Sequence, residues 1–476
     1  MFRSKSVWIF VLLISCAAFV GCHGATQVSS QTQSAGSSSV ILAMTDTPPS
    51  NVSILSAEVT LTGVTLSPGN VSLFSGSTTI ELTRLRTDIA YLATAANIAA
   101  GSYTTLSLTF ANPILTIEND TGSAIVSGTT TCAVGSICTI APTTVANLAT
   151  TITLSSFSVT AGSSEGLLVD VDLDNLLSAT MGADFKAGTT VSAFTPAGTG
   201  APLVGAEDVV GQVTSVDPVH NTFSFQNVSQ SFSLAVDSTS TFCQFPSTTC
   251  ATPAFACLQA NQILSVDIGI RADGSIVARN ILFEDADSSD TEVEGMITST
   301  NVASQQFNIV TLAISAGGTS LVVGEPATVH YSVAPQTPFV IDFTHADNVP
   351  VSTTGFLFAT PTDLCVGQQV SIRRNSTSSG SSINADRVEL RSSRITATVQ
   401  TVGSPYIYLY NLPSIFSGNG VTQIQVLTST PTIYSEDNLA KNFTEVFVPG
   451  VVSVRGPLFN VSGGRTLVAT KVVIEP

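Results

Sequence analysis

Charged residues are scarce in this chain of 476 residues, at 10% of the total, and Lys plus Arg number only 16 against 33 Asp plus Glu. The resulting net charge of -17 argues against nucleic-acid binding, because proteins bind phosphate backbones through Lys and Arg. Hydrophobic residues still make up 43% of the chain, which excludes a disordered acidic protein. At roughly 100 to 200 residues per domain, a chain of this length predicts three or four domains.

Histidine, tryptophan and helical patterns are also rare. The 4 histidines are scattered and offer no convincing general base, and neither they nor the cysteines have the spacing of a zinc site. The single tryptophan, Trp8, lies in the N-terminal leader. One helix is predicted from Thr87 or Asp88 through Ala100, and a turn or two over residues 174–181.

Strand patterns dominate instead. Segments such as 59–62 and 157–160 alternate apolar residues with Ser or Thr, and turn clusters such as 67–70 separate them. We therefore expect an all-β protein whose sheets pack on each other or close into barrels.

The N-terminus has the order of a secretory signal. Arg3 and Lys5 precede an apolar run over 7–20, which is shorter than the roughly 20 residues of a membrane-spanning helix. Residues 19–22, Phe-Val-Gly-Cys, resemble the lipobox of bacterial lipoproteins. The resemblance implies that residues 1–21 are removed as a lipoprotein signal peptide.

Lipid attachment would then fall on Cys22, and its acyl chains would hold the protein on a membrane. His23 stands where the family uses Asp for inner-membrane retention, so the resemblance implies the outer membrane. Ordinary secretion with cleavage elsewhere is the alternative. Residues 22–38 are rich in Ser, Gln and Gly without apolar periodicity, which predicts a flexible tether.

Six of the 8 cysteines remain once the leader and the lipid-attachment site are set aside, as suits an exported protein. Short, turn-rich loops favour two local disulfides. The predicted pairs are Cys132 with Cys138 and Cys250 with Cys257. Cys243 and Cys365 then either bridge neighbouring domains or stay free.

A repeat occupies the second half of the chain. Residues 209–214 match 293–298 and, more loosely, 395–399, and each copy ends in a similar hairpin. Three units with roughly five short strands each predict three small barrels. The acidic run 284–294 between the first two units is expected to be a solvated, self-repelling linker, with a divalent-ion site as the alternative.

Three motifs in the first half resemble the bacterial domain of unknown function 4382. They are Met-Thr-Asp at 44–46, Ala-Gly-Ser-Tyr at 100–103 and the Asp-rich strand 170–174. The resemblance implies a carbohydrate-binding-like β-sandwich over 39–203. The repeats are similar to the domain of unknown function 5666, found mainly as tandem β domains in exported bacterial proteins. The β-barrel repeats are expected over 207–287, 291–393 and 394–476, and neither family supplies a catalytic residue.

The Asp-rich strand is a candidate metal site. Asp170, Asp172 and Asp174 would share one strand face, because side chains alternate with period two. Three carboxylates in a row would suit Ca²⁺, although a solvated strand face is the alternative. An EF-hand is excluded, since Asn175 and Met181 stand where its Gly and Glu are required.

A run of tyrosines is a candidate ligand platform. Tyr406, Tyr408 and Tyr410 would share a strand face and could stack on sugar rings. However, Phe223 and Phe225 hold the corresponding strand of the first repeat, with polar partners between them. When residues are counted from the matched strands 209–214 and 395–399, Tyr408 lies one residue before the position that corresponds to Phe223. This comparison favours the tyrosines as core residues.

We therefore expect a lipid-anchored envelope protein that binds carbohydrate or another envelope polymer without catalysis. A structural or adhesive surface protein is the first alternative, and a glycosidase-type enzyme with paired carboxylates is the second. The expected partners are the membrane, through Cys22, and polysaccharide or envelope proteins, but not nucleic acid. No cofactor is expected other than the Ca²⁺ considered for the Asp-rich strand.

Overall fold

The structure is a computed structural model. It describes residues 38–47, 54–178, 180–194, 196, 203–244, 254–285, 291–315, 320–341, 356–429, 432–436, 439–461 and 464–475. These residues are almost entirely in strands, so the all-β prediction is confirmed. The α-helices among them are the single turns α1 (Leu173–Leu176) and α2 (Ser414–Ser417). Neither has the length or apolarity that crossing a membrane requires.

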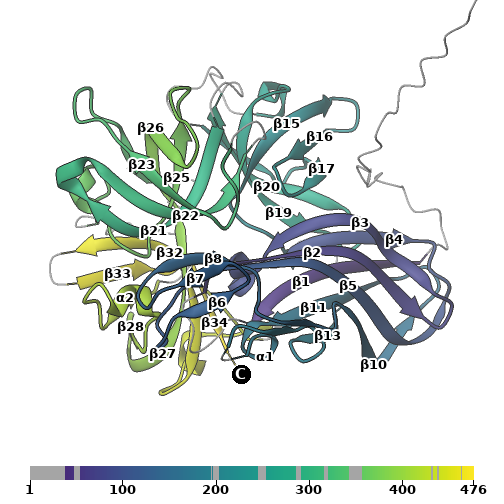
Figure 1. Ribbon diagram of the computed structural model, residues 1–476. Helices are drawn as coiled ribbons and strands as arrows, with labels where there is room; N and C mark the ends of the chain where they lie inside the picture. The colour runs from purple at the N-terminus through teal and green to yellow at the C-terminus, as the bar shows by residue number, and fades with distance from the viewer. Residues whose placement is uncertain are drawn as a thin grey trace, which may run out of the picture.

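A β-sandwich forms the first module, on the right of Figure 1. Sheet A has the order β13-β11-β1-β4 and sheet B the order β10-β5-β2-β3, with β8 (Ile137–Ile140) added to β5. Sheet A comprises β13 (Thr189–Phe194), β11 (Ser164–Asp172), β1 (Ser39–Thr47) and β4 (Ala90–Ala96). Sheet B comprises β10 (Ala149–Val159), β5 (Gly101–Glu118), β2 (Ile54–Ser67) and β3 (Val71–Glu81).

Strand β1 of sheet A is buried on both faces. On β1, Val40, Leu42 and Met44 belong to the sandwich core, while Ile41 and Ala43 pack with the core of the first barrel. Strands covered on both faces are apolar throughout rather than alternating. This explains the continuous apolar run along β1.

The helix predicted between residues 87 and 100 is wrong. Residues 90–96 form β4, which pairs antiparallel with β1. Leu92 packs in the sandwich core and Tyr91 against the first barrel, so both faces carry apolar side chains. Without polar residues on one face, the segment shows no period of two, and a helix and a buried strand look alike in sequence.

Three five-stranded barrels follow the sandwich. In each, the first strand pairs with the second and fourth, and the third runs parallel to the fifth. This Greek-key closure is the arrangement of OB-fold barrels. In chain order the first barrel comprises β15 (Val209–Asp217), β16 (Thr222–Gln226), β17 (Ser231–Ala235), β19 (Ile263–Ile270) and β20 (Ile276–Asp285).

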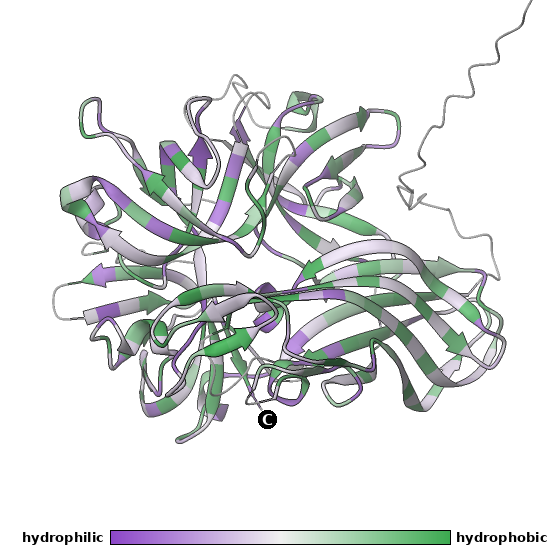
Figure 2. Ribbon diagram, in the orientation of Figure 1, coloured by the Kyte–Doolittle hydropathy of each residue, from purple (hydrophilic) through white to green (hydrophobic). Residues whose placement is uncertain are grey.

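The other two barrels repeat this order, with apolar bands alternating with pale ones along many strands in Figure 2. The second comprises β21 (Thr291–Asn301), β22 (Gln306–Ile314), β23 (Pro326–His330), β25 (Gln369–Arg374) and β26 (Ser382–Leu390). The third comprises β27 (Ser392–Gly403), β28 (Tyr406–Tyr410), β29 (Ile424–Leu427), β32 (Val451–Val461) and β33 (Gly464–Val468).

Short strands extend these sheets or form small two-stranded sheets. Those at barrel edges are β14 (Leu203–Val204), β18 (Thr241–Gln244), β24 (Phe339–Ile341), β30 (Ile433–Glu436), β31 (Leu439–Ala440) and β34 (Lys471–Ile474). Those in the sandwich module are β6 (Ile125–Ser127), β7 (Thr130–Cys132), β9 (Val145–Ala146) and β12 (Ala183–Asp184).

The four modules meet around what we call the central charge cluster. Arg387 Nη2 lies 2.5 Å from Glu284 Oε2 and 3.0 Å from Glu292 Oε1, and Arg391 also contacts Glu284. Arg394 Nη2 lies 2.5 Å from Asp88 Oδ2 in the sandwich. The cluster also includes Glu389 and the ion pairs Arg84–Glu294, Arg455–Glu207 and Arg455–Asp208.

The prediction of a solvated acidic linker over 284–294 is therefore wrong for its described residues. Glu284 is 0% exposed and Glu292 is 1% exposed. Burial of a carboxylate requires a counter-charge, and here arginines from β26 and the segment after it supply one. Burial raises the pKa of Glu292 to about 7 despite the attraction of Arg387.

Candidate binding face on the third barrel

The tyrosines of β28 point out of the third barrel. Ile407 and Leu409 are 0% exposed and fill the barrel core, whereas Tyr406 is 36% exposed and Tyr408 and Tyr410 are half-buried. The interpretation of these tyrosines as core residues is therefore wrong. The shared strand face predicted for them is present, on the outside of the barrel.

The one-residue offset of Tyr408 from the place of Phe223 explains the error. Residues 218–221 connect Asp217 to its partner Thr222 in the first barrel, whereas only 404–405 connect Gly403 to Tyr406 in the third. The residue equivalent to Phe223 is thus Ile407, not Tyr408. A register error of one residue places every side chain on the opposite face.

Amide side chains from the neighbouring strand and loop lie beside Tyr408. Gln425 on the neighbouring β29 donates from Nε2 to the Tyr408 hydroxyl at 2.9 Å, and its Oε1 accepts from Thr466 Oγ1 at 3.3 Å. Gln423 donates to Gln400 beside them. These bonds orient one ring and its neighbouring amides along β27, β28 and β29.

We call this surface the tyrosine face: the three tyrosines of β28 with Gln400, Gln423 and Gln425. It occupies the second and third strands of the barrel, which is where OB-folds bind oligosaccharides and oligonucleotides. Its aromatic rings can stack on the C–H faces of a ligand, while the amides can exchange hydrogen bonds with hydroxyl groups.

The strands equivalent to β28 in the other barrels carry no Phe, Tyr or Trp at these outward positions. In the first barrel the outward residues of β16 are Thr222, Ser224 and Gln226. In the second, β22 presents Gln306 and Asn308. The candidate face is therefore specific to the third barrel, although the three folds share one topology.

The three aspartates proposed as a metal site do not come together on one strand face. Asp170 accepts a hydrogen bond from Thr47 Oγ1 at 2.9 Å. β11 ends at Asp172, whose Oδ1 caps α1 by accepting from the Asp174 and Asn175 backbone amides. Asp174 lies in the helix and is exposed. Among the described residues, no group of three or more Asp, Glu, His or Cys side chains could hold a metal ion.

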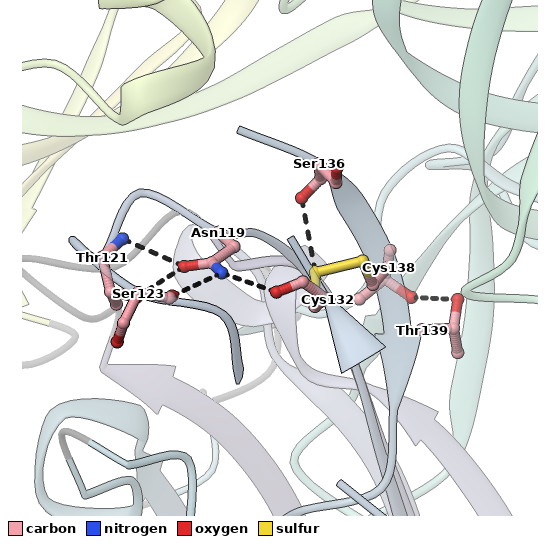
Figure 3. The surroundings of a disulfide bond; sticks show 8 residues. Asn119, Thr121, Ser123, Cys132, Ser136, Cys138 and Thr139 are labelled. Atoms are coloured by element: carbon pink, nitrogen blue, oxygen red, sulfur yellow. Dashed lines mark hydrogen bonds between the residues drawn. A yellow bond between two sulfur atoms is a disulfide. The ribbon is translucent and has the colours of Figure 1, made fainter. Parts of the chain in front are cut away.

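A disulfide joins Cys132 of β7 and Cys138 of β8, as predicted, and closes the loop between these two strands. Figure 3 shows Asn119 next to it, donating from Nδ2 to the Cys132 carbonyl oxygen at 2.8 Å and accepting from the Thr121 amide at 3.0 Å. The hydrogen bonds and the covalent link together shape this loop of the sandwich module.

The other predicted cysteine roles are settled only in part. Cys257 is disulfide-bonded, but Cys250, the partner predicted for it, lies outside the described residues, as does Cys22. Cys365 is a free, buried thiol, so it does not bridge two domains. Burial raises the pKa of Cys365 to about 12, which keeps the thiol protonated.

A small cavity lies at the module junction, and the sequence offered no signal for it. Its lining includes Arg84, Arg394, Asp208 and Glu294, which are brought together from all four modules. Its volume of about 10 Å³ suits a single water molecule. It therefore has no room for a sugar substrate.

A family model described as Domain of unknown function (DUF4382) matches residues 37–186. The sandwich module thus matches DUF4382. The match includes the Met-Thr-Asp, Ala-Gly-Ser-Tyr and Asp-rich motifs at 44–46, 100–103 and 170–174. The barrels lie outside the residues that match DUF4382.

Comparison with characterised proteins adds little to the DUF4382 match. No curated protein matches the chain. A solved structure, described as a multidomain protein with nucleic acid binding domains from Streptococcus pneumoniae TIGR4, is 10% identical. The similarity covers 55% of this chain and 72% of that one, with a TM-score of 0.10. A TM-score this low supports no argument about fold or function.

Proposed function

We propose that this protein is an exported, lipid-anchored component of the bacterial cell envelope that binds carbohydrate without catalysis. The tyrosine face on the third barrel carries the proposal, because Tyr406, Tyr408 and Tyr410 point outward while Ile407 and Leu409 fill the core. Its position on the second and third strands of an OB-type barrel supports the same function.

The chemistry of the tyrosine face suits a sugar chain. A pyranose ring presents C–H groups on its faces and hydroxyl groups around its edge, and the face offers aromatic rings flanked by amides. Gln425 both holds the Tyr408 hydroxyl and retains a second amide hydrogen for a ligand. The expected contribution of one stacked tyrosine is about 1 to 2 kcal/mol.

Binding by the full mature chain to a glycan array, followed by calorimetry on the best ligand, tests the proposal. Tyr408→Ala should weaken binding about 5- to 30-fold, the equivalent of about 1 to 2 kcal/mol. Phe447→Ala is the matched control, since Phe447 is also an exposed aromatic residue of this barrel, at 53%, but lies outside the face. If no glycan on the array binds in a way that depends on Tyr408, the proposal is refuted and a structural or adhesive role is favoured.

The lipid anchor is proposed from the leader and from the lipobox-like run ending at Cys22. Mass spectrometry of the mature N-terminus should find a diacylglycerol-modified, N-acylated cysteine at this position. Cys22→Ala should move the protein from the outer-membrane fraction to a soluble one. An unmodified mature N-terminus would contradict lipid anchoring without affecting the proposed carbohydrate binding.

A further inference from the structure

The charges of the molecule narrow the ligand class. Resting on the proposed function, we infer that the tyrosine face binds an uncharged polysaccharide, and neither an acidic polymer nor a basic one. Two independent features carry this inference: the face contains no charged side chain, and the cations of the described chain are almost all occupied elsewhere.

The strands that build the tyrosine face lie in an uncharged stretch. Residues 395–435, which include most of β27 and all of α2, β28 and β29, contain no Asp, Glu, Lys, Arg or His. On the adjoining β33, Thr466 pairs with Gln425, and Arg465 donates to Asn460. An ionic group of a ligand would therefore be desolvated against the face without a counter-charge, which costs free energy.

Most of the described cationic side chains are buried or half-buried and paired within the molecule. Among the described residues, Lys186 is the one exposed Lys or Arg, and it lies in the sandwich module. The ion pairs bind most of the others to carboxylates, and Lys471 donates to the Thr87 carbonyl. The paired residues are Arg84, Arg271, Arg373, Arg387, Arg391, Arg394, Lys441 and Arg455.

The electrostatic field around the protein also disfavours an acidic ligand. Because its cations are few and most of those described are paired with carboxylates, a chain of net charge -17 presents a negative surface that repels an acidic polymer. A basic polymer would be attracted, but to carboxylates elsewhere on the surface, so its binding would depend on salt and not on Tyr408. An uncharged polysaccharide needs only the stacking and hydrogen bonding that the face supplies.

Matched polymers that differ only in charge test the inference. The full mature chain is titrated with hydroxyethyl and carboxymethyl derivatives of cellulose, dextran and starch, and with chitosan, in about 0.05 and 0.5 M NaCl. At least one uncharged member should bind with a Kd that changes less than about twofold between the two salt concentrations, and Tyr408→Ala should weaken it. Its carboxymethyl counterpart should bind at least about tenfold more weakly at the lower salt concentration.

The outcomes separate the inference from the proposed function. If Tyr408-dependent binding favours a carboxymethyl polymer or chitosan, the ligand is charged and the inference is wrong, while carbohydrate binding stands. If none of the polymers and no array glycan binds through Tyr408, the proposed function fails and the inference fails with it.

A gain-of-function variant provides a second readout. Thr401 is exposed and pairs with Tyr408 across β27 and β28, so Thr401→Lys adds a cation at the edge of the face. The variant should bind the carboxymethyl polymer about 3- to 10-fold more tightly at the lower salt concentration and lose the gain at the higher one. Thr401→Gln is the uncharged control. If the two variants bind the carboxymethyl polymer equally well, the lack of cations is not what excludes acidic ligands, and the inference is wrong.

Discussion

Replacement of one buried carboxyl, Glu58, should make the protein more stable at alkaline pH. Glu58 on β2 is 9% exposed and lies directly opposite Glu81 on β3. A Cβ atom at Gly324 would lie 3.8 Å from Glu58 Oε2, so the second barrel closes over the carboxyl. Burial and the neighbouring Glu81 together raise the pKa of Glu58 from 4.5 to about 8.

The hydrogen bonds place the negative charge of this pair on Glu81. Its carboxylate accepts from the Ala57 amide at 3.0 Å, from the Thr83 amide at 3.0 Å and from the Thr83 hydroxyl at 2.7 Å. Glu58 is therefore the protonated member at neutral pH. Since Gln is the uncharged isostere of a protonated Glu, Glu58→Gln preserves the neutral state that the fold requires.

The pH dependence follows from linkage. Below about pH 4.5 Glu58 is protonated in both the folded and the unfolded protein, so it contributes no pH dependence there. As the pH rises from 4.5 towards the folded pKa of about 8, only the unfolded state ionises, and the folded state loses stability. The shift corresponds to at most about 5 kcal/mol of unfolding free energy, lost between these two pH values.

Urea denaturation across about pH 4.5 to 9 measures this difference. Relative to the wild type, Glu58→Gln should gain little near pH 4.5 and about 2 to 5 kcal/mol above pH 8. Glu81→Gln, the control at the paired position, should instead destabilise by about 1 to 3 kcal/mol, because it weakens the hydrogen bonds to the carboxylate. Parallel pH profiles for Glu58→Gln and the wild type would refute the reasoning.

Two further substitutions test the central charge cluster and the disulfide. Arg391→Ala removes one of the two arginines that contact Glu284 and should destabilise by about 3 to 5 kcal/mol in urea denaturation; a loss below about 1 kcal/mol would show that water compensates the carboxylate. Replacing Cys132 and Cys138 by Ser should cost only about 2 kcal/mol, since the disulfide closes a short loop. Unchanged thermal stability of this double variant would mean that the Asn119 hydrogen bonds suffice to hold the loop.

The sequence predicted the fold class and the repeated barrels because both depend on local patterns. Alternation and turn residues report strands directly, as in the outward Ser224 and inward Phe223 and Phe225 of β16. Local patterns fail where a distant module covers a surface. β4 looked helical because the first barrel covers its second face, which leaves no polar side to reveal a strand.

Long-range partners explain the other errors. Glu284 and Glu292 appeared solvated because Arg387, which neutralises both, lies far along the chain. The tyrosines were misassigned for a smaller reason: Tyr408 was matched to Phe223 although it lies one residue short of that place, and the strand partners match Ile407 to Phe223. Because side chains alternate along a strand, an offset of one residue is enough to place the tyrosines on the outer face.

The third barrel supplies two arginines to the central charge cluster, which affects how the protein can be divided into fragments. Asp88 in the sandwich pairs with Arg394, and Asp208 at the start of the first barrel pairs with Arg455. Both arginines lie in the final part of the chain. A fragment that ends before Arg394 keeps both aspartates and lacks both arginines. Excised single modules should consequently be poor surrogates for the whole, and one protease cut that releases the C-terminal part should loosen regions hundreds of residues away.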